Sequence, residues 1–323
     1  MNKQVLPMML MLLAGTAMAG CTEKEEKTVS EPLEVKKEEE VKPAEPVIEE
    51  PEPVQLTVTD PNSGQVLKEF FPDELGYGTN DAGYESTVTQ WAKEWARGKE
   101  GSPGIDQRMV ADKVDANGQI IKGQPRVVLD EKELVNRILT ASAKGGTVEL
   151  PVTTRESAYR VEEVPQLGEV VIASYTTYFN SAVAGRTKNI ELSAEALNNV
   201  IIGNGDIFSY NSTVGPGNEE NGYQEAPVAV DGELVMGIGG GVCQTSSTLY
   251  NAIDQLGVQY VEKHNHSVKV GYVPEGRDAT VAYGALDFRF QNTTGAPLLL
   301  RTTVQNGALT VEVRTSPVYS KNL

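Results

Sequence analysis

The sequence is poor in cysteine, histidine, aromatic residues and positive charge. Its 323 residues include two cysteines, two histidines and 6% aromatic residues, and 28 Lys and Arg stand against 45 Asp and Glu. A net charge of −17 argues against nucleic acid as a partner, because phosphate binding requires a basic surface. The apolar fraction of 39% is nevertheless sufficient for a packed core.

Long hydrophobic runs are also absent, and the one apolar stretch near the start predicts an export signal over residues 1–21. Lys3 supplies the positive charge and Val5 to Leu13 the apolar core, which is too short for a mature transmembrane helix. The ending Met18-Ala19-Gly20-Cys21 resembles a bacterial lipobox, in which the cysteine becomes the lipid-modified first residue. A plain signal peptide cut near Ala19 is the alternative.

The cysteine count gives this signal a consequence for the rest of the chain. If Cys21 carries lipid through its sulfur, Cys243 has no partner for an intramolecular disulfide and is a free thiol in an exported protein.

Residues 22–54 are rich in Glu, Lys and Pro, and charge repulsion and proline stiffness predict a disordered acidic tether.

Residues 55–165 predict a small α+β module. Glu85 to Arg97 is expected to be a helix ended by Gly98, with its two tryptophans in the core, and Asp130 is expected to cap a second helix. Thr147 to Val152 and, more weakly, Tyr159 to Val164 have the composition of strands.

Residues 166–323 are predicted to form a larger domain. The predicted fold class of the chain is α+β, mainly antiparallel β, with a helix that carries the cysteine at its N-terminus. Ser193 is expected to cap a short helix, Asp231-Gly232 to turn a hairpin, and Gln244 to Leu256 to form the cysteine helix. The expected strands are Val170–Tyr178, Ser267–Val273, Ala279–Tyr283, Leu286–Phe290, Leu298–Thr303 and Leu309–Val313, with a turn at Asn306-Gly307.

The glycine-rich approach to Cys243 has the composition of a nucleophilic site. Unpaired N–H groups and the dipole at a helix start lower the pKa of a thiol, which favours the reactive thiolate. The preceding Gly240 and Gly241 permit a tight turn and the close approach of a substrate carbonyl, and N–H groups from Val242 to Gln244 are candidates for an oxyanion hole. A small buried cysteine after a flexible loop is the alternative.

The two histidines follow this cysteine at a spacing of two. In an extended strand His264 and His266 would face the same side, one as general base and the other as a substrate or orienting contact. Asp278 or Asp287 would hold the base in its useful tautomer. The alternatives are a satisfied core histidine, or a zinc site made by Cys243, both histidines and Asp278, which a single cysteine makes weak.

Many motifs in order resemble the VanW domain family over about Ile190 to Arg314. They are Phe208-Ser209-Tyr210-Asn211, Gly222-Tyr223, Gly239 to Ala252, His266-Ser267, Tyr272-Val273-Pro274, Gly276 to Val281 and Asp287 to Asn292. The region before them is similar, more weakly, to a peptidoglycan-binding module that often precedes this domain. The family is associated with glycopeptide-resistance clusters.

The resemblance implies a cell-wall activity, because some proteins with this domain are described as L,D-transpeptidases that use a cysteine. Carried over, it makes Cys243 the nucleophile and His266 the base, and it fixes His264 less firmly. Asp278 and Arg277 match the motif Gly276 to Val281, but their roles are inferred from the residues and not from the resemblance. The expected oxyanion and substrate contacts are Gly240, Gly241, Gln244, Ser246, Arg277 and Tyr272. No cofactor or metal is expected.

The leading hypothesis is an exported lipoprotein, anchored to the membrane by lipid on Cys21 and facing the cell wall, that acts on peptidoglycan stem peptides. A cysteine peptidase or amidase acting on the same peptides is one alternative. A non-catalytic wall-binding protein is the other.

Overall fold

A computed structural model of the chain describes residues 52–230 and 233–322. The predicted export signal, the lipobox cysteine, most of the acidic tether and the Asp231-Gly232 turn lie outside the described residues. None of the described helices is long and apolar enough to cross a membrane.

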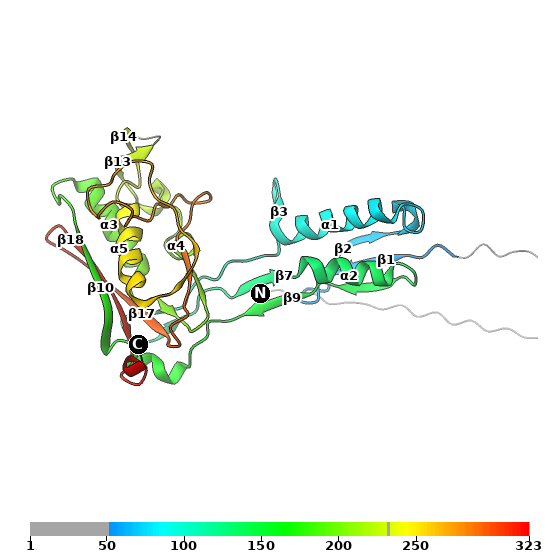
Figure 1. The fold of residues 1–323 in the computed structure, drawn as a ribbon, viewed down its shortest axis with the longest axis horizontal. Coiled ribbons are helices and arrows are strands. Elements are labelled where there is room, and N and C mark those ends of the chain that lie inside the picture. The colour runs from blue at the N-terminus through cyan, green and yellow to red at the C-terminus, as the bar shows by residue number, and fades with distance from the viewer. Residues whose placement is uncertain (1–51, 231–232, 323) are drawn as a thin grey trace, which may run out of the picture. The chain divides into compact units, whose positions relative to one another are not determined.

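The first module joins a small sheet to two helices (Figure 1). Strand β1 (Leu56–Thr59) pairs antiparallel with β2 (Val66–Phe70) and parallel with β8 (Gly146–Glu149). Helix α1 (Asp81–Arg97) packs against α2 (Glu131–Ala141). Fully buried residues from both helices and the sheet make one core.

The C-terminal end of α1 and the N-terminal end of α2 are both explained by the local sequence. Gly98 closes α1 with a φ of 81°, and the Asp130 carboxylate accepts a 2.9 Å bond from the Glu133 N–H at the start of α2. Trp91 and Trp95 are half-buried against the core, as expected for packing side chains. The predicted Thr147–Val152 strand is instead divided by Leu150-Pro151 between β8 and β9 (Val152–Arg155), which pairs with β7 (Arg126–Leu129).

The second domain is built on an antiparallel sheet with the strand order β10-β18-β17-β11. Helices α3 and α5 lie on one face of this sheet (Figure 1), and buried Leu249 and Ile253 of α5 pack with Val311 and Val313 of β18. The bounds are β10 Val170–Tyr178, α3 Ala184–Leu197, β11 Ile201–Ile202, α5 Val242–Ile253, β17 Leu298–Gln305 and β18 Ala308–Thr315.

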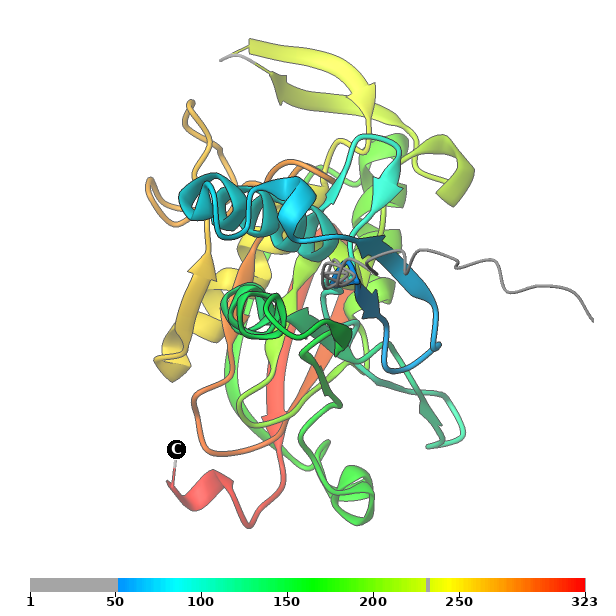
Figure 2. The same ribbon diagram turned by 90° about the vertical axis from the view of Figure 1, so that its right-hand side faces the viewer.

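Smaller elements surround the cysteine helix. A three-stranded sheet has the order β12-β16-β15, and the β13–β14 hairpin projects from the domain (Figure 2). The bounds are β12 Ile207–Ser209, α4 Tyr210–Val214, β13 Glu225–Val230, β14 Glu233–Ile238, β15 Gln259–Glu262 and β16 Arg289–Gln291. Two-residue strands form the pairs β3 (Gly98–Lys99) with β4 (Ser102–Pro103) and β5 (Lys113–Val114) with β6 (Ile120–Ile121). Short 3₁₀ helices cover Asp73–Leu75, Val161–Gln166, Glu219–Asn221, Asp254–Leu256 and Ser320–Asn322.

The mixed α+β class with mostly antiparallel strands is confirmed, and several predicted elements match. The strand over Val170–Tyr178 has the predicted bounds, and the cysteine helix begins at Val242, two residues before its predicted start. Asn306 and Gly307, with φ of 53° and 72°, form the tight turn between β17 and β18.

Several other predicted elements are wrong, among them a strand and a helix cap. Tyr159–Val164 is not a strand, because a 3₁₀ helix over Val161–Gln166 includes Pro165, which cannot donate to a strand ladder. Ser193 is no cap, because α3 begins nine residues earlier and the buried Ser193 hydroxyl donates to the Asn189 carbonyl at 2.9 Å.

The strand predicted over Ser267–Val273 is also wrong. This segment pairs with no strand in the described chain and forms an irregular loop. The predicted strand Ala279–Tyr283 is reduced to isolated bridges from Thr280 to His264 and from Ala282 to Leu286. Leu286–Phe290 contributes only its end to β16.

The buried face of β17 gives a stability prediction. Leu300 is fully buried in the sheet core, so Leu300→Ala should lower the free energy of unfolding by about 2–5 kcal/mol through lost burial and a residual cavity. Urea denaturation followed by far-UV circular dichroism measures this. Val318→Ala, at a side chain that is 68% exposed, should change it by less than about 0.5 kcal/mol. Equal losses in the two variants would contradict this assignment of the core.

Candidate active site around Cys243

Cys243 lies in the first turn of α5, directly after the glycine turn that ends β14. Gly241 is the N-cap with a φ of 119°, a conformation that favours glycine. A Cβ on Gly240 would lie 2.6 Å from the Pro227 carbonyl oxygen, so only glycine fits this close approach to β13. The turn therefore holds the cysteine at the point where helix and hairpin meet.

Asn189 of α3 fixes this turn from inside the domain. Its fully buried amide donates to the carbonyls of Gly240 at 2.9 Å and Gln224 at 2.8 Å, and accepts from the Gln224 N–H at 2.7 Å. Because buried backbone groups require partners, this side chain stabilises the two chain segments that form the rim of the site.

The polar face of α5 holds a second loop against the helix. Ser247 donates to the Cys243 carbonyl at 2.7 Å and accepts from the Ala279 N–H at 2.9 Å, while Ser246 donates to the Ala279 carbonyl. Asn251 donates to the Arg277 carbonyl at 2.7 Å. These buried polar residues explain why the helix after the cysteine is rich in Ser, Thr and Asn, which are poor helix formers.

Arg277 strengthens the same attachment rather than lining a binding cavity. Its guanidinium donates to the Asn251 side chain at 2.8 Å and pairs with Asp254 at 2.6 Å, and it lies 4.9 Å from the centroid of the Tyr250 ring. The structure thus gives Arg277 a positioning contact at the far end of α5, in place of the predicted contact with substrate.

The loop anchored in this way carries Asp278, which binds His266. The Asp278 Oδ2 lies 2.7 Å from the His266 Nδ1 and accepts the His266 backbone N–H at 2.6 Å. The Asn265 amide donates to the Asp278 Oδ1 at 2.7 Å. The His266 and Asp278 side chains are only 9% and 8% exposed, so the pair is shielded from water.

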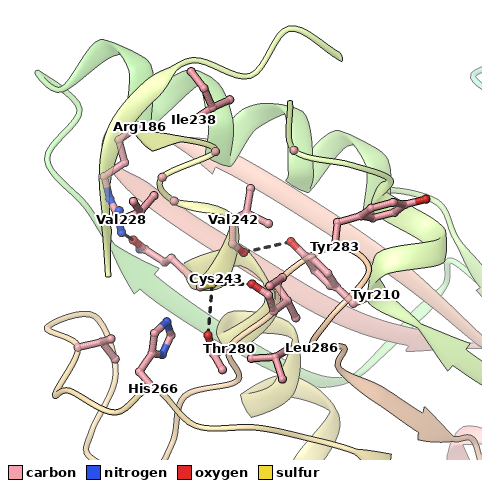
Figure 3. A pocket seen from close by; sticks show the side chains of 18 of the residues that line it. Arg186, Tyr210, Val228, Ile238, Val242, Cys243, His266, Thr280, Tyr283 and Leu286 are labelled. Carbon is pink, nitrogen blue, oxygen red and sulfur yellow. Dashed lines mark hydrogen bonds between the residues drawn. The ribbon is translucent and has the colours of Figure 1, made fainter. Parts of the chain in front are cut away.

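Electrostatics in this cluster favour a charged thiolate and imidazolium. Burial raises the pKa of the Cys243 thiol, but His266, Val281 and Thr280 together outweigh this and hold its pKa below the ordinary value. Burial lowers the pKa of His266, but Cys243 and Asp278 outweigh it and raise the pKa above the ordinary value. When it is protonated, the Cys243 thiol donates to the Val281 carbonyl at 3.4 Å, and its sulfur lies 3.7 Å from the Thr280 hydroxyl (Figure 3).

A cavity of about 480 Å³ opens over the thiol. Tyr210, Tyr283 and Leu286 lie on one side of Cys243, and Arg186 and His266 lie on the other (Figure 3). The backbone N–H of Val242 donates to Gly239 and that of Gln244 to Gly241. Among the described residues the Cys243 N–H has no acceptor, so it is the one group of the predicted oxyanion hole that is free.

The structure separates the two histidines. His264 is 40% exposed and bonds to Glu262 at 3.1 Å, away from the thiol. Asp287 likewise binds Ser209, Arg108 and the Asn211 N–H rather than an imidazole. The described residues include no group of three His, Cys, Asp or Glu side chains that could hold a metal ion, so the zinc alternative lacks a ligand set.

The remaining predicted residues divide between the cavity and the interior. Gly240, Gly241, Gln244 and Tyr272 line the cavity, whereas Ser246 is fully buried in the contact with Ala279. The Tyr272 hydroxyl is buried without a hydrogen-bond partner among the described residues.

Sequence reasoning missed Arg186, Asn189 and Asn251. Arg186 and Asn189 lie in the part of α3 that precedes its predicted start, and no local pattern connects them to a cysteine more than fifty residues later. Asn251 sits within the Gly239–Ala252 motif, but spacing alone does not show that its amide faces the loop.

The pKa directions predict the reactivity of the thiol. Alkylation of Cys243 by iodoacetamide should rise with pH at a midpoint below that of the urea-unfolded protein, because only the thiolate reacts. Cys243 and Asp278 both raise the pKa of His266, and Asp278→Asn removes the second of these charges, so the alkylation midpoint should move to higher pH. Mass spectrometry of the alkylated protein measures both.

Glu262→Gln is the matched control, because it alters the carboxylate beside the other histidine and should leave this midpoint in place. A midpoint unaffected by Asp278→Asn would show that the carboxylate does not act on the thiol through His266.

The sequence was compared with protein-family models, with known proteins and with solved structures, and the matches include the region around Cys243. The family model for VanW like protein matches residues 185–314. The chain is 35% identical to uncharacterized protein YoaR of Bacillus subtilis (strain 168) over 225 residues, 68% of this chain and 74% of YoaR. It is 29% identical to vancomycin B-type resistance protein VanW of Enterococcus faecalis (strain ATCC 700802 / V583) over 111 residues, 33% of this chain and 40% of that protein. No solved structure matches. The sequence motifs, the α+β fold and these relatives show that the chain belongs to the VanW family.

Proposed function

We propose that this protein is an acyltransferase that acts on peptidoglycan stem peptides through Cys243, as a cross-linking L,D-transpeptidase does. The observation that carries the proposal is that Asp278 binds His266 and that His266 lines the same cavity as the Cys243 thiol. A nucleophile, a base and a carboxylate that orients the base are the parts required for nucleophilic catalysis.

In the acylation step, the Cys243 thiolate attacks the carbonyl carbon of a peptide bond in the donor stem. A C–S bond forms and the carbonyl oxygen becomes an oxyanion, to which the free Cys243 N–H donates. When this intermediate collapses, the C–N bond breaks and the His266 imidazolium gives its proton to the leaving amine. A thioester and a neutral imidazole remain.

In the second step, an amine of an acceptor stem attacks the thioester carbonyl and His266 takes the proton from that amine. The C–S bond breaks, a new amide is formed and the thiolate and imidazolium return to their starting state. Throughout both steps Asp278 keeps the Nδ1 side of the ring occupied, which leaves Nε2 to carry the proton.

The acyl-enzyme is the species that tests this proposal. Incubation with muropeptides should give a covalent adduct on the wild-type protein in intact-protein mass spectrometry, and Cys243→Ala should give none. His266→Ala should slow adduct formation by about 10²–10⁴-fold, the usual contribution of a general acid or base. His264→Ala is the matched control, since this exposed histidine contacts Glu262 and should leave the rate unchanged.

The products separate this activity from its two alternatives. Larger, cross-linked muropeptides indicate transfer to an amine, whereas smaller ones indicate transfer to water, as in a peptidase or amidase. Peptidoglycan pull-down that is retained in Cys243→Ala, with no adduct or turnover in the wild type, would overturn the enzymatic proposal in favour of a wall-binding protein.

We also propose that the protein is exported and anchored to the membrane by lipid on Cys21, which places Cys243 at the cell wall. Metabolic labelling with an alkyne fatty acid should mark the wild-type protein in a bacterial host, and Cys21→Ser should abolish the label. Cys243→Ala, which removes the other cysteine, should keep it. An unlabelled wild type, or a label that survives Cys21→Ser, would contradict lipidation.

A further inference from the structure

Arg186 is a cation at the cysteine cavity that pairs with no carboxylate in the described part of the chain. It lies in the first turn of α3 and lines the cavity together with Cys243. Arg277 and Arg289 each pair with a carboxylate, but among the described residues no Asp or Glu lies within salt-bridge distance of Arg186. Burial lowers the pKa of Arg186, although a guanidinium remains charged in proteins.

The Gln244 amide holds this guanidinium in place. The Gln244 Nε2 donates to the Thr177 hydroxyl at 3.0 Å and to the Tyr178 carbonyl at 3.1 Å, so its Oε1 is turned to accept the Arg186 Nη2 at 2.7 Å. On another side, the guanidinium carbon lies 5.9 Å from the centroid of the Tyr272 ring. Since Arg has five N–H donors, most of them are left for a ligand.

The charge in the cavity changes during the proposed reaction. Among the described residues no Asp or Glu lines the cavity, and its ionisable groups are Arg186, His266, Cys243 and three tyrosines. The pKa directions of Cys243 and His266 favour a thiolate and an imidazolium there. Thioester formation removes the negative charge of the thiolate, and the Arg186 cation then faces a cavity without an anion. A negatively charged group on the peptide would balance this charge and satisfy the free donors.

We propose that Arg186 binds a carboxylate of the substrate peptide and thereby selects the bond that Cys243 attacks. This inference rests on the proposed function. Figure 3 shows Arg186 and His266 on the same side of Cys243, opposite Tyr210 and Leu286. His266 protonates the leaving amine, so the side with Arg186 is the leaving-group side. A C-terminal amino acid, whose amine leaves and whose α-carboxylate stays attached to it, places both groups there.

The test compares peptides that differ in one carboxylate. The probes are a muropeptide with a free C-terminal carboxylate, the same muropeptide amidated at its C-terminus, and a third form amidated only at a side-chain carboxylate. For the wild type, C-terminal amidation should lower kcat/KM for adduct formation by about 10- to 100-fold, the range for hydrogen bonds to a charged group. Side-chain amidation should have little effect.

Arg186→Gln should remove this preference, so that the free and C-terminally amidated peptides react at similar rates. Arg186→Lys keeps the positive charge and should therefore retain part of the preference for the free C-terminal carboxylate that Arg186→Gln loses. Arg301→Gln, at an exposed arginine of β17, is the control and should keep the wild-type preference. A wild type that reacts equally with the free and amidated peptides would overturn the inference. A preference for the side-chain carboxylate that depends on Arg186 would place that carboxylate, and not the C-terminal one, at the guanidinium.

A second measurement distinguishes recognition from a general effect on the thiol. If Arg186 only stabilises the thiolate, Arg186→Gln will raise the pH midpoint of iodoacetamide alkylation and slow all three peptides equally, which overturns the inference. If it binds carboxylate, the selectivity between the free and C-terminally amidated peptides will be lost whether or not the alkylation midpoint moves, because the Arg186 charge also acts on the thiolate. Adduct formation that fails with every peptide in the wild type instead contradicts the proposed function.

Discussion

The attachment of one loop to the buried polar face of α5 is the constraint on which the site depends. Ser247 and Asn251 bind the backbone of residues 277–279, and Arg277 closes the contact at the far end of the helix. Each buried hydrogen bond contributes about 0.5–1.5 kcal/mol, and an unpaired buried group costs more than that. The helix that carries Cys243 therefore also fixes the carboxylate that binds His266.

The same reasoning explains why residues outside the cavity matter to it. Asn189 never reaches the thiol, yet its amide fixes the glycine turn that sets the direction of the first turn of α5. Gln244 lies next to the cysteine in sequence, but its amide is oriented by Thr177 and Tyr178 of β10. Helices α3 and α5 thus meet at the cavity, and β10 orients one of the side chains that line it.

Much of the fold was predictable because the signals are local. The helix cap at Asp130, the tight turn at Asn306-Gly307 and the buried stripe of the cysteine helix require only neighbouring residues. The failures share a cause. The alternation of Ser267–Val273 has the period of a strand, but a strand also requires a partner, and the sequence does not state which segment lies beside another.

The sequence by itself determined the family and the α+β class, because the motifs and the helix and strand signals depend on neighbouring residues. It also singled out Cys243 and the two histidines as candidates, because residues of these types are few in the chain. Only the tertiary structure decided the surroundings of the two histidines, since Asp278 contacts the His266 ring and Glu262 the His264 ring. It also brought Arg186 to the cavity across the interface of α3 and α5. Charge pairing and burial depend on which segments, distant in the sequence, lie next to each other in the fold. No local sequence pattern shows which segments these are.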